Sequence, residues 1–276
     1  MTYTKRTTIS SYVLTLNSER YLATILERLR RFSDEVLVVD SGSTDRTCAI
    51  AAEQGCPVLH RPFDDFRSQR EFAVAQCRCE YVFFCDCDEI PSPELVSWLA
   101  DAAGRGLTHD VYRIRRDWRA FGRSVHGICP TPSPDYPQRL VRRAVATYRN
   151  STKVHERYDF RWDHGFKVEA PLVHMTFESN AELRAKLRAY SRFAAQDLAG
   201  RGWSIPRLAS NALLSPPAAF LHWYLLKRNV LDGWVGVKLA AYAAAFKFGK
   251  YGGALRLRLL DRLRPSKTVL DRLRRS

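Results

Sequence analysis

The chain has 276 residues, of which 46% are hydrophobic and 26% are charged. This balance is typical of a folded globular protein and excludes a disordered or collagen-like chain. The 44 basic residues outnumber the 29 acidic ones and give a net charge of +15 at pH 7. Most of this excess lies in residues 201–276, where the acidic residues are Asp232, Asp261 and Asp271. We therefore expect this segment to meet an anionic partner, either a nucleic acid or a phospholipid surface.

The N-terminal segment lacks the continuous apolar stretch of a signal peptide, so we expect a cytoplasmic location. The seven cysteines are then expected to be reduced thiols and not a disulfide framework. The longest uncharged run is 208–226, and Pro216 and Pro217 interrupt it, which makes it a poor spanning helix. An interfacial or re-entrant segment and an ordinary buried pair of helices both fit this run.

Strand and helix signals alternate through the first hundred residues. The pattern predicts strands at Ile9–Leu16, Val36–Val39, Pro57–His60 and Tyr81–Cys85, and helices at Tyr21–Leu29, Thr44–Gln54, Ser68–Cys79 and Pro93–Ala103. Ser18 is the expected N-cap of the first helix, and Gly55 and Gly104 are expected to close the second and fourth. This alternation predicts a parallel sheet with helices on both faces, which binds ligands at the carboxyl ends of its strands.

The second half of the chain has a different pattern. Basic and aromatic segments predict strands at Tyr112–Trp118 and Gln138–Tyr148, separated by a loop at Pro130–Pro137. After His174 the apolar spacing predicts helices, including Leu183–Leu198 and a basic C-terminal helix. We therefore expect an α/β domain followed by a helical extension.

Two carboxylates, Asp86 and Asp88, follow the fourth predicted strand. Alternate side chains of a strand share a face, so we expect the two to point the same way and to repel each other unless a cation lies nearby. Mg²⁺ or Mn²⁺ bridging to a diphosphate suits such a site, whereas a pair of solvated aspartates before Pro91 is the alternative. Zinc is disfavoured because the nearby C-x-C pairs, Cys77/Cys79 and Cys85/Cys87, fit neither common zinc spacing.

Polar residues also follow the first and second predicted strands, at Asn17 and at Asp40–Ser43. An acidic residue that ends a strand and precedes small residues and a helix can accept hydrogen bonds from a nucleobase or a ribose. The alternative is that these residues simply cap the helix, through Ser43 or Thr44.

Together these motifs make the chain similar to a known family. Residues 9–104 resemble the inverting family 2 glycosyltransferases with the GT-A fold, through the strand leading to Asn17, VVDSGSTDRT at 38–47 and DCD at 86–88. Later segments look like bacterial lipopolysaccharide-core hexosyltransferases: YPQRLVRR at 136–143, VHE at 154–156, LVH at 172–174 and the aromatic, basic stretch 220–251. The resemblance implies a GT-A domain at 1–180, with a nucleotide-sugar half at about 1–104 and an acceptor half at about 105–180. It also implies a helical, membrane-associating region at 181–276.

The resemblance also implies roles for individual residues. Asp40 would contact the base of the nucleotide sugar and Thr15 would help frame that base. Asn17 would also belong to the nucleotide-sugar site, Arg70 would reach the nucleotide or its diphosphate, and Asp86 would approach the ribose or the metal. Asp88 would be the main metal ligand and His174 would complete the metal site, although a core or helix-capping histidine fits His174 equally well. Glu71 and Cys87 depart from the family's usual residues, and neither departure removes a ligand.

The resemblance places the catalytic base at Glu156, and Asp135 is a rival. Arg139 and Arg142 either grip phosphates of the acceptor or form a solvated strand face. The resulting hypothesis is an inverting, Mg²⁺- or Mn²⁺-dependent enzyme that moves a hexose, with glucose favoured, from a nucleotide sugar, with a UDP-sugar favoured, to a lipopolysaccharide-core or other lipid-linked glycan.

The basic tail would bind the anionic inner face of the cytoplasmic membrane, and the expected contact residues are Trp223, Tyr224, Trp234, Tyr242, Phe246, Phe248, Lys227, Arg228, Lys238, Lys247 and Lys250. Two alternatives stay open. One is a phosphatase of the haloacid dehalogenase type with Asp86 as nucleophile and Asp88 as acid. The other is a nucleic-acid-binding protein, although no zinc-finger, RRM or KH signature is visible and no nucleic acid is expected.

Overall fold

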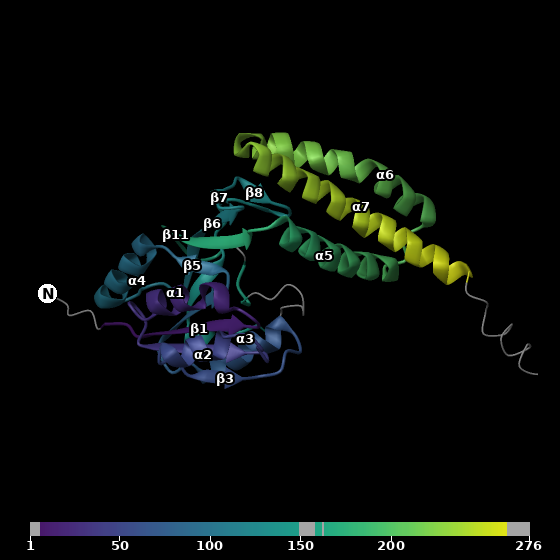
Figure 1. Cartoon of the computed structure of the whole chain (residues 1–276). Coiled ribbons are helices and arrows are strands. Elements are labelled where there is room, and N and C mark those ends of the chain that lie inside the picture. Colours follow the sequence, from purple (N-terminus) through teal and green to yellow (C-terminus); the bar gives the residue numbers. More distant parts are fainter. Residues whose placement is uncertain (1–5, 149–157, 162, 264–276) are drawn as a thin grey trace, which may run out of the picture. The chain divides into compact units, whose positions relative to one another are not determined.

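A computed structural model of the chain describes residues 6–148, 158–161 and 163–263. They form two compact units (Figure 1). The sheet unit comprises 1–118 and 134–176, and the helical unit comprises 119–133 and 177–276. Residues 119–133, which the sequence suggested to be part of an acceptor half, therefore pack with the C-terminal helices.

The sheet unit is built on one mixed sheet. Its strands in the described residues follow the order β3-β2-β1-β4-β10-β6-β11-β5. Their bounds are β1 (Ile9–Thr15), β2 (Glu35–Asp40), β3 (Val58–His60), β4 (Tyr81–Asp86), β5 (Glu89–Pro91), β6 (Val111–Ala120), β10 (Gln138–Arg142) and β11 (Phe166–Phe177). The pairs among β1 to β4 are parallel, as the sequence predicts, whereas β10 runs antiparallel to β4 and β6, and β11 runs antiparallel to β5.

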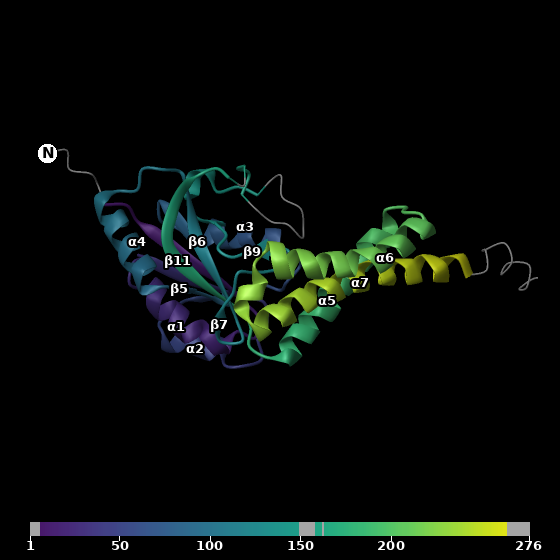
Figure 2. The same cartoon turned by 90° about the horizontal axis from the view of Figure 1, so that it is seen from above.

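Period-two alternation in the central strands gives the sheet two apolar faces. Ile9, Val13, Val38 and Phe83 point to one face, and α1 (Glu19–Leu29), α2 (Thr47–Glu53) and α4 (Pro93–Arg105) pack there. Tyr12, Val39 and Phe84 point to the other face, which α3 (Phe66–Gln76) covers. Figure 2 shows α3 on the opposite side of the strands from α1 and α4. The fold class predicted from the sequence, a mostly parallel sheet with helices on both faces and a helical extension, is confirmed.

Several predicted helix ends differ in the structure. Ser18 precedes α1, but its hydroxyl accepts a hydrogen bond from the Leu16 N–H and caps nothing. The C-cap of α4 is Gly106, at φ 91°, and not Gly104, because the helix continues to Arg105. The N-cap position of α2 is held by Arg46. The capping alternative for Ser43 and Thr44 is therefore wrong.

The helical unit consists of α5 (Asn180–Gly200), α6 (Ile205–Leu221), α7 (Trp234–Leu263) and the short turns η2 (His222–Leu226) and η3 (Asn229–Asp232). It also contains β7 (Arg123–Ser124), β8 (Gly127–Ile128) and β9 (Thr131–Pro132). Figure 1 shows α6 and α7 side by side, with α5 next to α7. The close approach of α5 and α7 requires glycine, since a Cβ at Gly249 would lie 2.7 Å from Ser191 Cβ and one at Gly253 would lie 2.8 Å from Ala195 Cβ.

The uncharged run 208–226 forms most of α6 and all of η2. The helix runs through Pro216 and Pro217, which the sequence suggested would interrupt it, and the turn comes only at η2. Leu208 and Ala219 are buried among the helices, whereas Leu213 and Leu214 are 75% and 66% exposed. Among the described residues, none of the helices has the length and apolarity needed to span a bilayer.

The cysteines are free thiols, as expected. Cys77 and Cys85 are buried, and Cys87 packs partly buried against the core. Burial raises the pKa of Cys77 to about 12 and that of Cys87 to about 11. These thiols are therefore protonated core side chains at neutral pH.

Glu35 joins the starts of three central strands. Its Oε2 accepts hydrogen bonds from Ser10 Oγ at 2.6 Å and from the Arg78 N–H at 2.9 Å, and its Oε1 accepts one from Arg78 Nε at 2.7 Å. Burial opposes ionisation, but these hydrogen bonds from Ser10 and Arg78 hold the pKa of Glu35 below its ordinary value of 4.5.

Replacing Glu35 with Gln is expected to lower the free energy of unfolding at pH 7 by about 1.5–3 kcal/mol, the range for hydrogen bonds to a charged group. Because the folded-state pKa is the lower one, this contribution is complete above pH 4.5 and disappears as the pH falls through the folded-state value. Urea denaturation of both proteins between pH 7 and pH 3 measures it. A gap between the two proteins that stays constant over this range would contradict the prediction.

Candidate active site

The carboxyl ends of three parallel strands bring the predicted polar residues to one edge of the sheet. In the strand register Thr15 lies opposite Asp40, and Leu14 lies opposite both Val39 and Asp86. The end of β1 is thus flanked by the carboxylates that end β2 and β4. This is the edge where the fold class binds ligands.

Asp40 is held by a set of donors at the end of β2. Its side chain is 1% exposed, and Oδ2 accepts the N–H groups of Gly42 and Ser43, both at 2.9 Å. Its Oδ1 accepts hydrogen bonds from Thr15 Oγ1 at 2.9 Å and from Ser43 Oγ. Burial opposes ionisation, but the bonds from Ser43, Gly42 and Thr15 hold the pKa of Asp40 below its ordinary value. Asp40 is therefore a fixed, charged acceptor.

Asn17 links the loops that follow β1 and β2. Its backbone has φ 51°, its N–H donates to Ser43 Oγ at 2.8 Å, and its side-chain Oδ1 accepts the Thr44 N–H at 2.8 Å. Gly42, at φ 104°, makes the turn between Asp40 and Ser43. These bonds fix the shape of the loop around the Asp40 carboxylate.

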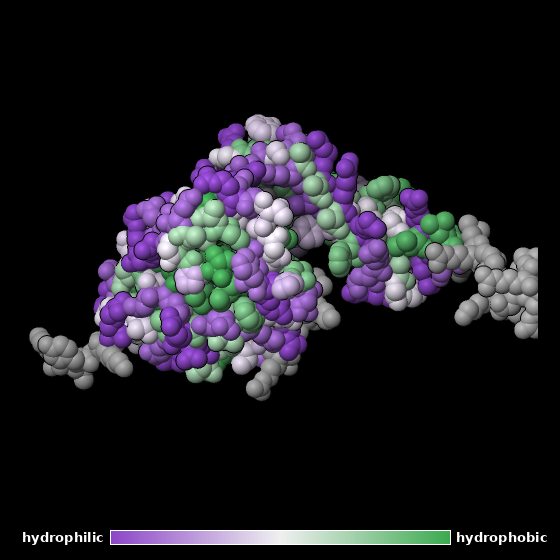
Figure 3. Space-filling view, turned by 60° about the horizontal axis from the view of Figure 1, so that its bottom comes forward, coloured by the Kyte–Doolittle hydropathy of each residue, from purple (hydrophilic) through white to green (hydrophobic). Residues whose placement is uncertain are grey.

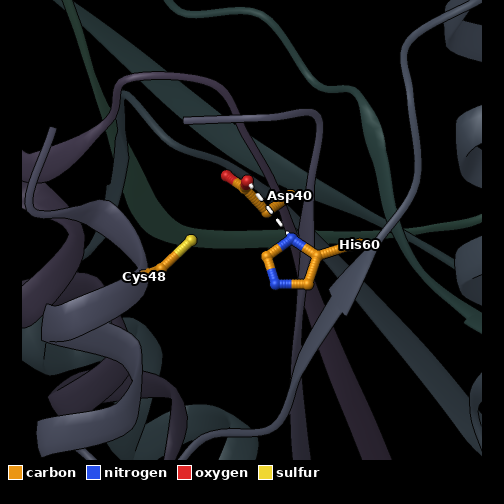
Figure 4. Close-up of side chains that lie close together, drawn as sticks. All are labelled: Asp40, Cys48 and His60. Atoms are coloured by element: carbon orange, nitrogen blue, oxygen red, sulfur yellow. Dashed lines mark ion pairs between the residues drawn. The ribbon is translucent and has the colours of Figure 1, made fainter. Parts of the chain in front are cut away.

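His60 and Cys48 also lie close to Asp40, as Figure 4 shows. In the described part of the chain this is the one group of three such residues whose ligand atoms all lie within 4.8 Å of one another. His60 Nδ1 is 3.7 Å from Asp40 Oδ2. Both carboxylate oxygens already accept two hydrogen bonds each, which fills their lone pairs. A cation would have to displace these donors, so we do not assign a metal site here.

Helix α3 contributes Gln69 and Arg70. Gln69 Nε2 donates to Ser41 Oγ at 3.1 Å and to the Arg61 carbonyl at 3.0 Å, which ties the helix to the loop after β2. The Arg70 guanidinium lies 3.5 Å from the centroid of the Phe84 ring, and its Nη2 is 3.7 Å from Asp86 Oδ1. The structure therefore brings Arg70 to the same edge as Asp86.

Asp86 and Arg139 form an ion pair at the end of β4. Arg139 Nη2 donates to Asp86 Oδ2 at 2.8 Å, and its guanidinium lies 4.3 Å from the Phe84 ring centroid. Arg139 is 6% exposed, so the solvated-face alternative is wrong for this residue. A register shift between Gln138 and Leu140 marks a β-bulge at Arg139, and bulges change the direction in which a side chain points. Burial and the negative charge of Glu89 raise the pKa of Asp86.

Glu89 is the buried centre of this charge network. Its side chain is 0% exposed, and its Oε1 accepts hydrogen bonds from Arg139 Nη2 at 2.5 Å and from Arg116 Nη1 at 2.7 Å. Burial opposes ionisation, but Arg139 and Arg116 hold the pKa of Glu89 below its ordinary value. From the sequence, Glu89 is expected at this edge of the sheet only as the residue that follows Asp88, and Arg116 is not singled out. The available signal was an acidic residue directly after the aspartate pair, together with arginines in the basic, aromatic strands predicted at Tyr112–Trp118 and Gln138–Tyr148.

Asp88 and His174 face each other beside this network. β4 ends at Asp86, and Asp88 lies in the turn before β5, so strand alternation does not extend to it. The two carboxylates therefore have different partners. His174 Nε2 is 3.2 Å from Asp88 Oδ2, and the Met175 N–H donates to the Asp88 carbonyl at 2.8 Å.

His174 is held in place by Trp118, whose ring stacks on it with centroids 4.4 Å apart. The side chain is 12% exposed, and its buried Nδ1 has no hydrogen-bond partner. The unsatisfied Nδ1 lies 4.0 Å from Glu89 Oε1, whereas Nε2 faces Asp88. An imidazole Nε2 and a neighbouring carboxylate are ligand types that fit a divalent cation.

Asp135 contacts two neighbouring side chains through three hydrogen bonds. It accepts hydrogen bonds from Arg116 Nε at 3.0 Å and Arg116 Nη2 at 2.7 Å, and a third from Trp118 Nε1 at 2.9 Å. Through these bonds it fixes both the Arg116 guanidinium that reaches Glu89 and the Trp118 ring that stacks on His174. It is 21% exposed.

Two predicted residues do not join this group. Arg142 pairs with Tyr81 in the register, at the opposite end of β4 from Asp86, a separation of about 16 Å along the strand. There it forms ion pairs with Glu80 and Asp110, so an acceptor role beside Asp86 does not fit its position. Glu156 lies outside the residues that the structure describes.

The chain is similar to several known proteins. Residues 10–159 match the family described as Glycosyl transferase family 2. The lipopolysaccharide core biosynthesis glycosyltransferase LpsC of Rhizobium meliloti (strain 1021) is 29% identical over 86% of this chain and 88% of its own length. An uncharacterized glycosyltransferase of Rickettsia felis is 26% identical over 96% of this chain and 93% of its own.

Among solved structures, glucosyl-3-phosphoglycerate synthase from Mycobacterium tuberculosis in complex with phosphoglyceric acid is similar at 23% identity and a TM-score of 0.40. The similarity covers 51% of this chain and 59% of that one. The family match, in contrast, spans more than half of this chain and contains β1 to β4 with Asp40, Asp86 and Asp88. The phosphatase and nucleic-acid alternatives are therefore set aside, and the chain belongs to glycosyl transferase family 2.

Proposed function

We propose that this glycosyltransferase moves a hexose, with glucose favoured, from a UDP-sugar to a lipopolysaccharide-core or other lipid-linked glycan. The observation that carries the proposal is the convergence of Asp40, Asp86 and Asp88 at the ends of β2 and β4, on either side of β1. The similarity to LpsC over most of both chains supports the class of acceptor.

The nucleotide would bind against Asp40. Because all four lone-pair positions of its carboxylate accept hydrogen bonds, a base N–H that contacts Asp40 must replace one of the present donors. The hydroxyls of Thr15 and Ser43 can rotate away, whereas the backbone N–H groups of Gly42 and Ser43 cannot. Arg70, beside Asp86, would reach the diphosphate, for which a guanidinium is well suited.

Asp88 and His174 would hold Mg²⁺ or Mn²⁺. Asp86 is the weaker candidate ligand, because Arg139 already occupies one of its oxygens. When bound, the cation would neutralise negative charge on the departing diphosphate. The buried pairing of Arg139 and Arg116 with Glu89 keeps the strands around this site in place without using Asp88.

A carboxylate base must remove the proton of the acceptor hydroxyl for direct displacement at the anomeric carbon. We assign this role to Glu156. The three hydrogen bonds of Asp135 support a positioning role for that residue instead, since they hold the Arg116 guanidinium and the Trp118 ring in place. The enzyme would act in the cytoplasm at the inner face of the membrane, where a lipid-linked acceptor is found.

A thermal-shift screen against UDP-, GDP-, dTDP- and CMP-sugars, with and without Mn²⁺, tests the donor. The expected result is a metal-dependent increase in Tm with UDP-glucose that exceeds the increase with the other nucleotides, because ligand binding to the native state stabilises it. A radiolabelled transfer assay on lipopolysaccharide core isolated from a truncated strain tests the acceptor. Stabilisation by a different nucleotide sugar alone would overturn the UDP assignment.

Asp88→Ala is expected to abolish transfer and to remove the Mn²⁺ dependence of the thermal shift, because the main metal ligand is lost. His174→Ala should weaken the Mn²⁺ response in the same direction. Asp110→Ala is the matched control, since Asp110 lies at the opposite end of the sheet in an exposed ion pair with Arg142. Full Mn²⁺-dependent activity of Asp88→Ala would contradict the metal assignment.

Glu156→Gln is expected to lower kcat by about a hundredfold to ten-thousandfold, the usual contribution of a general base, while donor binding is retained. Asp135→Asn should instead reduce activity less and lower Tm, since it disturbs Arg116 and Trp118. Steady-state kinetics and thermal denaturation of both variants distinguish the roles. If Asp135→Asn removes transfer with an unchanged Tm while Glu156→Gln stays active, the base is Asp135.

A further inference from the structure

Exposed hydrophobic side chains are unevenly distributed between the two units. In the described sheet unit the large ones are Leu16, Phe63, Phe66 and Phe166, and the rest belong to the helical unit. At the right of Figure 3, hydrophobic residues of the helical unit lie at the surface beside hydrophilic ones. Scattered single residues need no explanation, but a contiguous group marks an interaction surface.

One group is dense. Where α6 ends and α7 begins, five large apolar side chains are more than half exposed: Leu221 at 55%, Leu225 at 54%, Leu226 at 74%, Leu231 at 67% and Trp234 at 52%. They lie on α6, η2, η3 and the first turn of α7, which pack on one another. We call these five residues the leucine tip.

The outer faces of α6 and α7 continue this apolar surface. On α6 the exposed residues before the tip include Leu213, Leu214, Pro217 and Ala218, which carry no charge. On α7 the exposed face after Trp234 follows helical spacing through Val237, Ala241, Ala245 and Phe248. Both helices thus bury one apolar face in the unit and expose another.

The charge around the tip is of one sign. Between residues 202 and 260 the sole acidic residue is Asp232, which is 4% exposed and paired with His126. Lys227 and Arg228 directly follow Leu226, and the ammonium group of Lys238 lies 4.3 Å from the Trp234 ring centroid. Accessible groups here are therefore apolar or positive. On α5, by contrast, the exposed Tyr190 and Phe193 lie among both acidic and basic residues.

Two aromatic residues expected from the sequence to face the membrane do not do so. Trp223 is 6% exposed and packs with Ala219 and Ala240, and Tyr242 is 6% exposed and contacts Phe177. They hold the helices together because their rings lie on the inner faces of η2 and α7. The outward surface is made mainly of leucines.

We propose that the leucine tip inserts into the headgroup region of an anionic phospholipid bilayer, with Lys227, Arg228 and Lys238 contacting lipid phosphates. The inference deepens the proposed membrane location, on which it rests, by naming the inserting surface. Apolar side chains beside basic ones, with no accessible carboxylate, match this interface, and Trp234 suits the boundary between headgroups and acyl chains. A second copy of the chain is disfavoured as occupant, because it would bring like charges together.

Co-sedimentation with vesicles tests the proposal. The full-length protein is mixed with phosphatidylglycerol/phosphatidylethanolamine vesicles or with neutral phosphatidylcholine vesicles, at low and high salt. We expect the wild type to bind the anionic vesicles, and we expect this binding to weaken with salt. Leu226→Glu/Leu231→Glu is expected to bind these vesicles at least about tenfold more weakly than the wild type. Phe193→Glu is the matched control for the single variant Leu226→Glu, since it places the same charge on a similarly exposed apolar site of α5 and should bind like the wild type.

The Tm and the donor-induced thermal shift of each variant are measured in parallel, so that a folding defect is not mistaken for lost binding. Equal binding to neutral and anionic vesicles, or an equal loss in Phe193→Glu, would overturn the proposal. The proposal would also be overturned if the wild type binds no vesicles and sedimentation velocity shows that it is a dimer, while Leu226→Glu/Leu231→Glu is a monomer. If the protein binds vesicles through the leucine tip but does not transfer sugar, this inference is supported and only the proposed function is contradicted.

Discussion

The burial of Glu89 between two arginines is the constraint on which the site depends. Removing a carboxylate from water costs several kcal/mol, and Arg139 and Arg116 offset that cost only while both remain in place. Since Glu89 lies on β5, Arg116 on β6 and Arg139 on β10, the network fixes strands that are far apart in sequence. Removing one partner would leave an uncompensated buried charge, which typically costs about 3–5 kcal/mol.

This network also explains why neighbouring acidic residues behave differently. Arg139 donates hydrogen bonds to both Asp86 and Glu89, so Asp86 is part of the same network of charges. Asp88, two residues later, faces His174 instead. Asp135 belongs to the network as well, through Arg116. Asp88 therefore faces an imidazole, whereas Asp86, Glu89 and Asp135 each accept a hydrogen bond from a guanidinium group.

The sequence predicted the first half of the sheet well because its signals are local. Short apolar runs between helical segments define β1, β2 and β4, and parallel pairing then brings Thr15, Asp40 and Asp86 together without further information. The second half was less predictable. The antiparallel insertion of β10 beside β4, the bulge at Arg139 and the position of Arg142 at the far end of the strand depend on pairings between distant segments, which spacing alone does not encode.

In the helical unit, too, the sequence alone did not predict which side chains lie at the surface. The composition of 201–276 correctly indicated an apolar and basic segment, but which side chains face outward depends on how α5, α6 and α7 pack. Gly249 and Gly253 let α7 approach α5 closely. In the packed unit Tyr242 is buried and Trp234 is exposed. A large aromatic side chain such as Tyr242 buries a large apolar area when it packs between helices. The same packing that stabilises the unit therefore leaves its leucines on the outside.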